Sequence, residues 1–459
     1  MQTNPSNPAG LPVAIIGAGP VGLAAAAHVL AHGFSPLIFE AGDTVASHLE
    51  DYRHVRLFSP WRYNVDHQAA ALLERAGWNM PEPDVLPTAG ELVDTYLAPL
   101  ARLAPIAAGL RFNHRVTAIS REGLDKVKTN GRDNAAFIVR TQSVSGVKQH
   151  RAWAVLDATG TWGTPNPLGA SGLPAEGEDQ FAARIRYGMP DIHGHDRERY
   201  AGKRTLVVGA GHSAIGTLAA LGDLANSHPG TQIVWVIRGD NLARIYGGGE
   251  ADGLPARGAL GIRLKRLVDS GRLEVHAKFR ISELQSVTDG IDVVSDDQRV
   301  LAGIHEIVAA TGSRPDVSIA RELRVKLDPW LESTEALAPL IDPNVHSCGT
   351  VRPHGHRELE QPESRYYAIG AKSYGRAPNF LMATGYEQAR SVVAALAGDF
   401  VAADDVQLDL PETGVCSSGF SAPQITKSCC KPVPVTVESV PAQTVPERSV
   451  ATDGGRCGC

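Results

Sequence analysis

A glycine-rich turn between an apolar strand and a helix constrains this chain most, because the chain contains it twice. The two turns are Gly17-Ala18-Gly19-Pro20-Val21-Gly22 and Gly209-Ala210-Gly211-His212-Ser213-Ala214. Each turn follows a short apolar run, at 12–16 and 204–208, and precedes a helix-forming segment. Further apolar runs at 36–40 and 232–238 complete two βαβ units. Alternating β and α elements predict an α/β fold of parallel sheets covered by helices, with two Rossmann-like dinucleotide-binding domains.

In the first turn, each glycine has a separate expected role. Gly17 allows the tight turn, Gly19 lets a pyrophosphate approach the backbone, and Gly22 lets the helix pack on its strand. The helix beginning at Pro20 presents free N–H groups to the anion. Glu40 ends the second strand, where its carboxylate accepts hydrogen bonds from two ribose hydroxyls. We therefore expect FAD at this site.

The second unit differs where its second strand ends. Arg238 stands there instead of an acid, and a guanidinium suits the 2′-phosphate of NADPH. The alternative is that Arg238 is a solvated charge at a strand end. The third glycine is replaced by Ala214, which the motif permits. The predicted NADPH cradle consists of Gly209, Gly211, Ser213 and Ala214.

Three later segments extend the pattern and set the expected domain boundaries. Strands that end in Ala-Thr-Gly lie at 154–160 and 307–312, and a strand-then-turn at 366–370 precedes a helix expected from about 380 to 396. We expect an FAD-binding domain at 12–165 and 316–400, interrupted by an NADPH-binding domain at 200–312. The rest, 401–459, contains many prolines and no helical periodicity, and is expected to be a mostly extended or disordered tail.

Composition excludes several classes of protein. The formal net charge of the 459 residues is −6 and no basic block occurs, which argues against nucleic acid as a partner. The first Lys or Arg is Arg53, so the positive region that a secretory signal needs is not expected here. The long apolar run at 11–30 is interrupted by glycines and a proline, which argues against a membrane span. A cytoplasmic protein is expected; a homo-oligomer stays open.

The ordered set of motifs resembles the two-dinucleotide-domain flavoproteins, which include flavin-containing monooxygenases and pyridine nucleotide-disulfide oxidoreductases. The resemblance covers about 12–400 and implies an enzyme, an FAD- and NADPH-dependent oxidoreductase. It implies a helix near Asn379 and Phe380 that aims its positive end at the flavin. It also places further residues at the cofactors, namely His48, Ser59, Thr159, Gly160, Thr311 and Gly370. For His48 and Ser59 a structural role stays open, and no catalytic residue is assigned.

The resemblance favours the monooxygenase branch, because no cysteine precedes Cys348 and a dithiol beside the flavin is therefore absent. The stretch 181–187 lacks the Gly and His of the Phe-x-Gly-x-x-x-His fingerprint of flavin monooxygenases, which puts hydroxylation itself in doubt. The segments 57–63 and 370–378, with the cysteine-rich tail, are similar to flavin-dependent monooxygenase-like proteins of bacterial arsenic resistance. The implied substrate is a small soft nucleophile, with trivalent arsenic a candidate, and molecular oxygen the co-substrate.

The tail cysteines supply the competing interpretations. Neighbouring thiols suit a soft metalloid, and the candidates are Cys429, Cys430, Cys457 and Cys459. One alternative function is an NADPH-dependent thiol, disulfide or metalloid reductase that uses these cysteines. Another is a redox or metalloid sensor without turnover, and a tail whose thiols have no role is also open.

Overall fold

The computed structural model describes residues 7, 10–247, 249, 255–346, 351–378 and 380–408, and all of them belong to one compact unit, Met1–Ser418. The second unit, Gly419–Cys459, lies outside the described residues. Cys429, Cys430, Cys457, Cys459 and Asn379 therefore also lie outside them, as do most of the predicted tail and Cys348.

The first βαβ unit belongs to a five-stranded parallel sheet. Its strands, in spatial order, are β16 (Tyr366–Ala368), β7 (Ala154–Asp157), β1 (Val13–Ile16), β2 (Pro36–Phe39) and β3 (Leu110–Arg111). All four residues of β1 are buried, as expected for a central strand of a parallel sheet covered on both faces. The predicted strands at 12–16, 36–40 and 366–370 are confirmed.

The second βαβ unit belongs to another five-stranded parallel sheet, whose strands have the same spatial arrangement. Its strands, in spatial order, are β8 (Ile185–Tyr187), β15 (Glu306–Ala309), β9 (Arg204–Val208), β10 (Gln232–Val236) and β11 (Glu274–His276). β15 lies beside β9 as β7 lies beside β1, so the two Ala-Thr-Gly segments occupy equivalent places. The duplication seen in the sequence therefore extends to the whole sheet, and the α/β fold class is confirmed.

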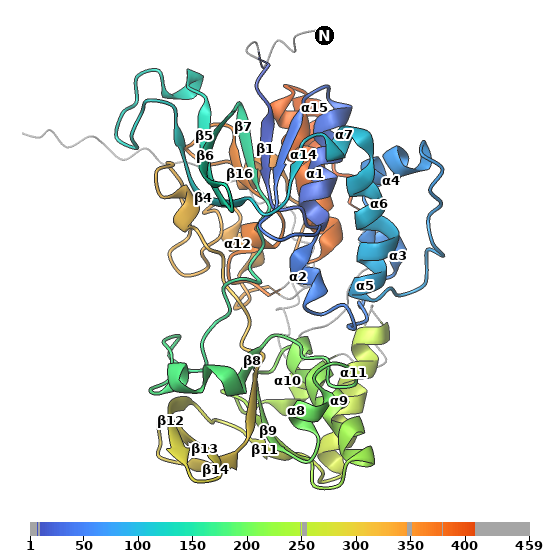
Figure 1. Ribbon diagram of the computed structural model, residues 1–459, viewed down its shortest axis with the longest axis vertical. Coiled ribbons are helices and arrows are strands. Elements are labelled where there is room, and N and C mark those ends of the chain that lie inside the picture. Colours follow the sequence, from blue (N-terminus) through green and yellow to red (C-terminus); the bar gives the residue numbers. More distant parts are fainter. Residues whose placement is uncertain are drawn as a thin grey trace, which may run out of the picture. The chain divides into compact units, whose positions relative to one another are not determined.

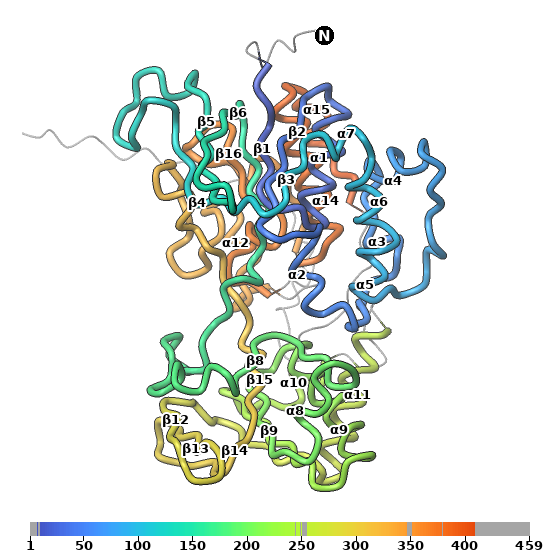
Figure 2. The backbone as a smooth tube through the Cα atoms, in the orientation of Figure 1, coloured from blue at the N-terminus to red at the C-terminus, as the bar shows by residue number. Residues whose placement is uncertain are grey.

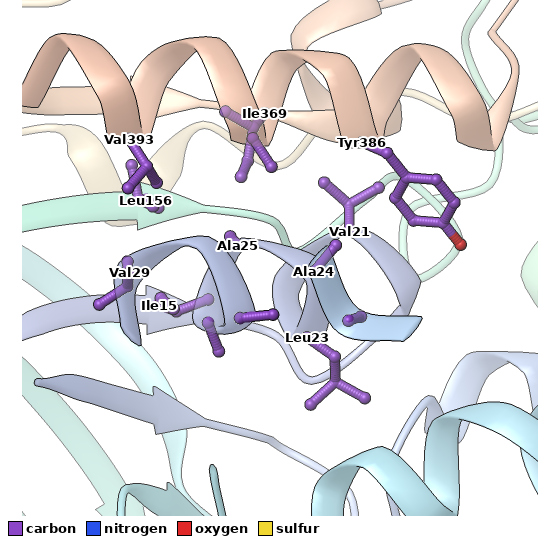
Figure 3. Packing of buried hydrophobic residues seen from close by; sticks show 14 of the residues in the cluster. Ile15, Val21, Leu23, Ala24, Ala25, Val29, Leu156, Ile369, Tyr386 and Val393 are labelled. Atoms are coloured by element: carbon purple, nitrogen blue, oxygen red, sulfur yellow. The ribbon is translucent and has the colours of Figure 1, made fainter. Parts of the chain in front are cut away.

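Two long helices pack over the first sheet. α1 (Pro20–Ala31) follows the first glycine turn, and α14 (Met382–Leu396) packs directly against it. Figure 3 shows Val21 and Ala25 of α1 facing Tyr386 and Val393 of α14, with Ile369 between the helices. Small side chains on α1 permit this close approach. The α1 residues from Val21 to Val29 are buried.

The remaining elements surround these two sheets (Figure 1). Two antiparallel sheets are inserted at equivalent places, before β7 and before β15. They consist of β4 (Arg115–Arg121), β5 (Phe137–Ser143) and β6 (Gly146–Ala152), and of β12 (Ile281–Val287), β13 (Gly290–Ser295) and β14 (Val300–Ile304). The helices of the first domain are α2 (Ser47–Glu50), α3 (Trp61–Asn64), α4 (His67–Glu74), α5 (Ala89–Leu92), η1 (Val93–Leu97), α6 (Ala98–Arg102), α7 (Ala104–Ala107), η2 (Arg132–Asn134), η5 (Ser318–Ala320), α12 (Ala338–Ile341), α13 (His356–Leu359), η6 (Gly370–Tyr374) and α15 (Phe400–Asp404). Those of the second are η3 (Glu178–Arg184), α8 (Arg197–Tyr200), α9 (His212–Ser227), α10 (Leu242–Tyr246) and α11 (Pro255–Asp269).

Two connections join the domains, and Figure 2 lets both be followed along the chain. They lie side by side, because Pro165 and Ser313 form an antiparallel bridge and the Asn166 N–H donates to the Gly312 carbonyl at 2.9 Å. The Thr311 hydroxyl also donates to the Asn166 carbonyl. The two connections between the domains are therefore paired with each other.

Two details differ from the predicted boundaries. β8 lies before residue 200, outside the predicted second domain. It nevertheless forms the edge of the second sheet, because it pairs with β15. The predicted extended tail began at 401, but α15 spans Phe400–Asp404 and buries Ala403. Its Asp404 accepts hydrogen bonds from Arg357, which tie α15 to α13. Among the described residues no helix is long and apolar enough to cross a membrane.

Candidate functional site

Backbone crowding requires the first glycine of each turn and the third glycine of the first turn. Gly17 has φ +98°, and a Cβ there would lie 2.8 Å from the Ala158 carbonyl oxygen. Gly209 has φ +132°, and its Cβ would lie 2.2 Å from the Ala310 carbonyl oxygen. A Cβ at Gly22 would meet the Gly17 carbonyl oxygen at 2.0 Å. These contacts are between each turn and its own helix or Ala-Thr-Gly segment, as the motif predicts.

The second glycine of each turn faces open space instead. A Cβ at Gly19 or at Gly211 would have no atom within 4 Å. Both residues are helix N-caps without a side-chain cap, and neither following helix carries an acid in its first turn. Uncapped N–H groups beside open space fit a bound pyrophosphate. The absence of a Cβ at these positions therefore makes room for a ligand.

The ends of the second strands carry opposite charges. Glu40 follows β2 and accepts hydrogen bonds from the Ala18 and Gly42 N–H groups, both at 2.8 Å, and from the Ser47 hydroxyl at 3.0 Å. These bonds fix the carboxylate beside the first glycine turn. Arg238 follows β10 and is exposed, with one long contact of 3.5 Å to the Ala170 carbonyl. The acid is held in place and the arginine is available to a ligand.

A buried ion pair lies at the end of β7, where the second domain has only Ala309. Lys372 donates to Asp157 at 2.6 Å, and both side chains are almost fully buried. Tyr366 and Thr159 also donate to this carboxylate, at 3.1 and 2.8 Å. Burial and the nearby Asp157 charge raise the pKa of Tyr366 well above its usual value, so its hydroxyl stays a donor. The network holds Thr159 and Gly160, the start of the connection from the first domain to the second, against the turn after β16.

The turn after β16 is held by a second buried network. Gly370, at φ +71°, donates its N–H to the Gln388 side-chain oxygen at 2.7 Å. The Gln388 amide donates to His354 Nε2 at 2.9 Å, and His354 Nδ1 donates to the Arg352 carbonyl at 3.1 Å. Burial lowers the pKa of His354, so the imidazole is neutral and can accept from Gln388. The turn is therefore supported by a histidine that must stay uncharged.

A cavity of about 800 Å³ lies over the second glycine turn. Four residues predicted to bind NADPH, Gly209, Gly211, Ser213 and Arg238, line it together with Thr311, which was predicted to lie at a cofactor. Trp162, Arg376 and Pro378 contribute to the same lining. Ala214, also predicted, lies buried under the helix start and supports the turn without facing the cavity.

Some predicted cofactor residues have other contacts in the structure. Ser59 donates its hydroxyl to the Asn64 side chain at 2.8 Å, within its own segment. Phe380 packs edge-on against Tyr374, with ring centroids 5.3 Å apart. α14 begins at Met382, two residues after the predicted start. His48 is exposed and lies near Gly163, 3.8 Å from where a Cβ would stand, so it flanks the connection that starts at Thr159 and Gly160.

Sequence reasoning did not single out Asp157, Lys372, Gln388 or His354 as parts of the site. One signal was present in the sequence. An aspartate inside the apolar run Val155-Leu156-Asp157-Ala158 must be buried if the run is a central parallel strand, and a buried carboxylate needs a cation. Nothing in the sequence indicates which of the many later lysines and arginines supplies it.

Two parallel sheets, each with a glycine turn open to a pyrophosphate, define a two-domain dinucleotide oxidoreductase. The family model for pyridine nucleotide-disulphide oxidoreductases matches residues 14–349, and the chain belongs to this family. It is therefore a flavin-dependent pyridine-nucleotide oxidoreductase, which confirms the prediction of an FAD- and NADPH-dependent enzyme. No curated protein matches the chain.

Solved structures share the fold at low sequence identity. Bacillithiol disulfide reductase from Bacillus cereus is 18% identical, with a TM-score of 0.62 over 84% of this chain and 99% of that one. A cadaverine monooxygenase of desferrioxamine biosynthesis from Erwinia amylovora, solved with FAD, is 14% identical, with a TM-score of 0.59 over 87% and 97%. Thioredoxin reductase from T. acidophilum is 14% identical, with a TM-score of 0.54 over 85% and 99%. Reductases and monooxygenases both occur among these structures, so the fold alone does not choose between them.

Proposed function

We propose that the chain is an NADPH-dependent FAD monooxygenase that oxidises a small soft nucleophile, with a trivalent arsenic species as the leading candidate substrate. In the overall reaction NADPH supplies two electrons, one oxygen atom of O₂ enters the substrate, and the other leaves as water. FAD, when bound, supplies the transfer of electrons from NADPH to oxygen. The proposed setting is the cytoplasm.

The observation that carries the proposal is the opposite charge at the two strand ends. Glu40, held by three donors beside the first turn, suits the ribose hydroxyls of FAD. Arg238, exposed in the cavity over the second turn, suits the 2′-phosphate of NADPH. The chain's own groups thus bind and orient two different dinucleotides. The proposed domain boundaries follow the two sheets, with the paired connections at 165 and 313 between them.

The distribution of cysteines favours oxygen over a disulfide as the electron acceptor. No cysteine occurs in residues 1–347, and the described residues contain none. A flavin-adjacent dithiol would have to come from Cys348 or from the five cysteines after residue 410. Those cysteines support a second candidate, a thiol, disulfide or metalloid reductase that uses Cys429, Cys430, Cys457 and Cys459.

One experiment separates the candidates. The purified full chain is mixed with NADPH in air, with and without arsenite, and NADPH, O₂ and arsenate are measured. A monooxygenase consumes O₂ and NADPH together and forms arsenate. A reductase consumes NADPH with a disulfide or an oxidised metalloid under anaerobic conditions, and a sensor consumes none. If arsenite changes neither the rate of NADPH consumption nor that of O₂ consumption, arsenic is not the substrate.

The matched control for the tail is a full-length variant in which Cys429, Cys430, Cys457 and Cys459 are all changed to serine. If the tail delivers the substrate, this variant has a raised KM for arsenite while its reduction by NADPH is unchanged. If the tail thiols are the electron acceptor, the variant loses disulfide reduction altogether. Unchanged arsenite kinetics would show that the tail has no part in delivery.

A further inference from the structure

Arg376 reaches the cavity over the second glycine turn from the first domain. It lies in the loop after η6, and its backbone is fixed because its N–H donates to the Leu331 carbonyl at 2.7 Å. The preceding Gly375 has φ +58°, and a Cβ there would lie 2.0 Å from the same carbonyl oxygen. The loop is therefore tightly held against 331–333, while the Arg376 side chain is exposed at the cavity wall.

The guanidinium of Arg376 has no hydrogen-bond or ion-pair partner among the described residues, whereas Arg314 contacts Asn166 and Glu332 and Arg390 contacts Glu387. The cavity contains Arg238 as a second arginine, and no Asp or Glu is found among its described lining residues. Another cavity, of about 730 Å³, has a wall of mixed charge, in which carboxylates such as Glu50, Asp94 and Asp191 lie beside Arg53 and Arg186. Because the described residues of its wall include two arginines and no carboxylate, the cavity over the second glycine turn favours an anionic ligand.

Contacts between the domains bring this wall close to the second glycine turn. Phe58 of the first domain packs edge-on against His212, the first residue of α9, with centroids 5.1 Å apart. Trp162 is fixed by a 2.7 Å hydrogen bond to Asp51, and a Cβ on Gly188 of the second domain would lie 2.8 Å from its ring. A ligand at the start of α9 is therefore within a space that both domains enclose.

We infer that Arg376 is a second anion-binding residue of the NADPH site and pairs with the pyrophosphate. This assignment rests on the proposed function, in which Arg238 takes the 2′-phosphate. The nicotinamide carries no negative charge to pair with a second arginine, and the pyrophosphate belongs at the start of α9, in the same cavity. Recognition of the dinucleotide then depends on both domains, and Arg376 binds a group that NADPH and NADH share.

The test is equilibrium binding of NADP⁺, NAD⁺ and adenosine 2′-monophosphate to the FAD-loaded full chain by calorimetry, which needs no turnover. Arg376→Ala should weaken NADP⁺ and NAD⁺ equally, by about 10-fold, and leave adenosine 2′-monophosphate unchanged. Arg238→Ala should weaken NADP⁺ and adenosine 2′-monophosphate but not NAD⁺. Arg376→Lys, which keeps the charge, should weaken both dinucleotides by less than about 3-fold.

Arg102→Ala is the matched control, since Arg102 is an exposed arginine of the first domain that is absent from the cavity wall. It should bind all three ligands as the wild type does. Undiminished dinucleotide binding by Arg376→Ala, with normal FAD content, would overturn the assignment, and so would a loss confined to NADP⁺. A wild-type chain that binds neither dinucleotide would overturn the proposed function itself.

Discussion

The two halves of this molecule share a strand order and a glycine turn but differ in the charges that follow the second strand and end the strand beside the first. The first sheet has Glu40 after its second strand and Asp157 at the end of β7, paired with Lys372. The second sheet has Ala309 at the place of Asp157, and Arg238 one residue beyond the place of Glu40. Under the proposed assignment, the turns are similar because both dinucleotides contain a pyrophosphate. The charges differ because the proposed ligands differ in the rest of the molecule.

The comparison also shows that the two sites are supported differently. In the first domain, buried networks through Asp157 and Gln388 hold Thr159 and the turn at Gly370. In the second, Ala309 stands at the place of Asp157, and the cavity is bounded on one side by residues of the first domain. A permanently bound cofactor suits the rigid site, and a cofactor that must leave each turnover suits the open one.

The largest expected effect comes from filling the second glycine of each turn. Gly19→Val and Gly211→Val each place a side chain where a pyrophosphate belongs, and neither meets a protein atom within 4 Å at Cβ. Gly19→Val should purify without FAD. Gly211→Val should retain FAD and lose its reduction by NADPH. The absorbance spectrum before and after NADPH gives both results, and two variants with the same defect would show that the sites are not separate.

The next effect concerns the buried pair that only the first sheet has. Lys372→Met leaves the Asp157 carboxylate buried without its cation and should lower the free energy of unfolding by about 3–5 kcal/mol. Adding Asp157→Ala, which copies Ala309 of the second sheet, should recover at least half of that loss. Denaturant unfolding of both variants checks this. A loss below about 1 kcal/mol for Lys372→Met would mean that the pair is not desolvated.

A smaller effect is expected at the strand end of the second sheet. Arg238→Ala removes the charge-assisted contact to the 2′-phosphate and should cost about 1.5–3 kcal/mol in the apparent binding of NADPH. NADH has no such phosphate and should be used as before. The ratio of kcat/KM for the two cofactors measures this difference. Equal losses for both cofactors would mean that Arg238 does not contact the 2′-phosphate.

The smallest expected effect is on how the stability of the first domain depends on pH. Burial lowers the pKa of His354 below its usual 6.5, so protons bind the unfolded chain more readily than the folded one. Its contribution to stability is complete above pH 6.5 and falls as the pH drops below that value, by at most about 1.4 kcal/mol per pH unit. His354→Gln should flatten the fall in melting temperature between pH 7 and 5.

The matched control is His67→Gln, an exposed histidine at the start of α4. It should melt with the same pH profile as the wild type. If His354→Gln also keeps the wild-type profile, the support of Gly370 through Gln388 does not depend on a neutral imidazole.

The sequence predicted the central parallel strands, both glycine turns and the helices α1, α9 and α14, because each depends on a local pattern of apolar runs and glycines. The short strands β3 and β11 and the helix α11 were not predicted. The antiparallel sheets at 115–152 and 281–304 were not predicted, and bulges interrupt the register of three of their strand pairs. β8 was missed because it pairs with β15 across more than a hundred residues. The partner of Asp157 and the cavity role of Arg376 depend on tertiary contacts that no local pattern encodes.

The central claim, that one chain holds FAD in its first site and NADPH in its second, is tested most directly by an anaerobic NADPH titration of the purified protein. The account predicts a yellow protein with one FAD per chain, whose visible flavin absorbance disappears with one equivalent of NADPH. It also predicts that the flavin of Arg238→Ala is reduced only at a higher NADPH concentration, while the NADH concentration needed is unchanged. A colourless protein that takes up no FAD, or a yellow one that neither cofactor bleaches, would contradict it.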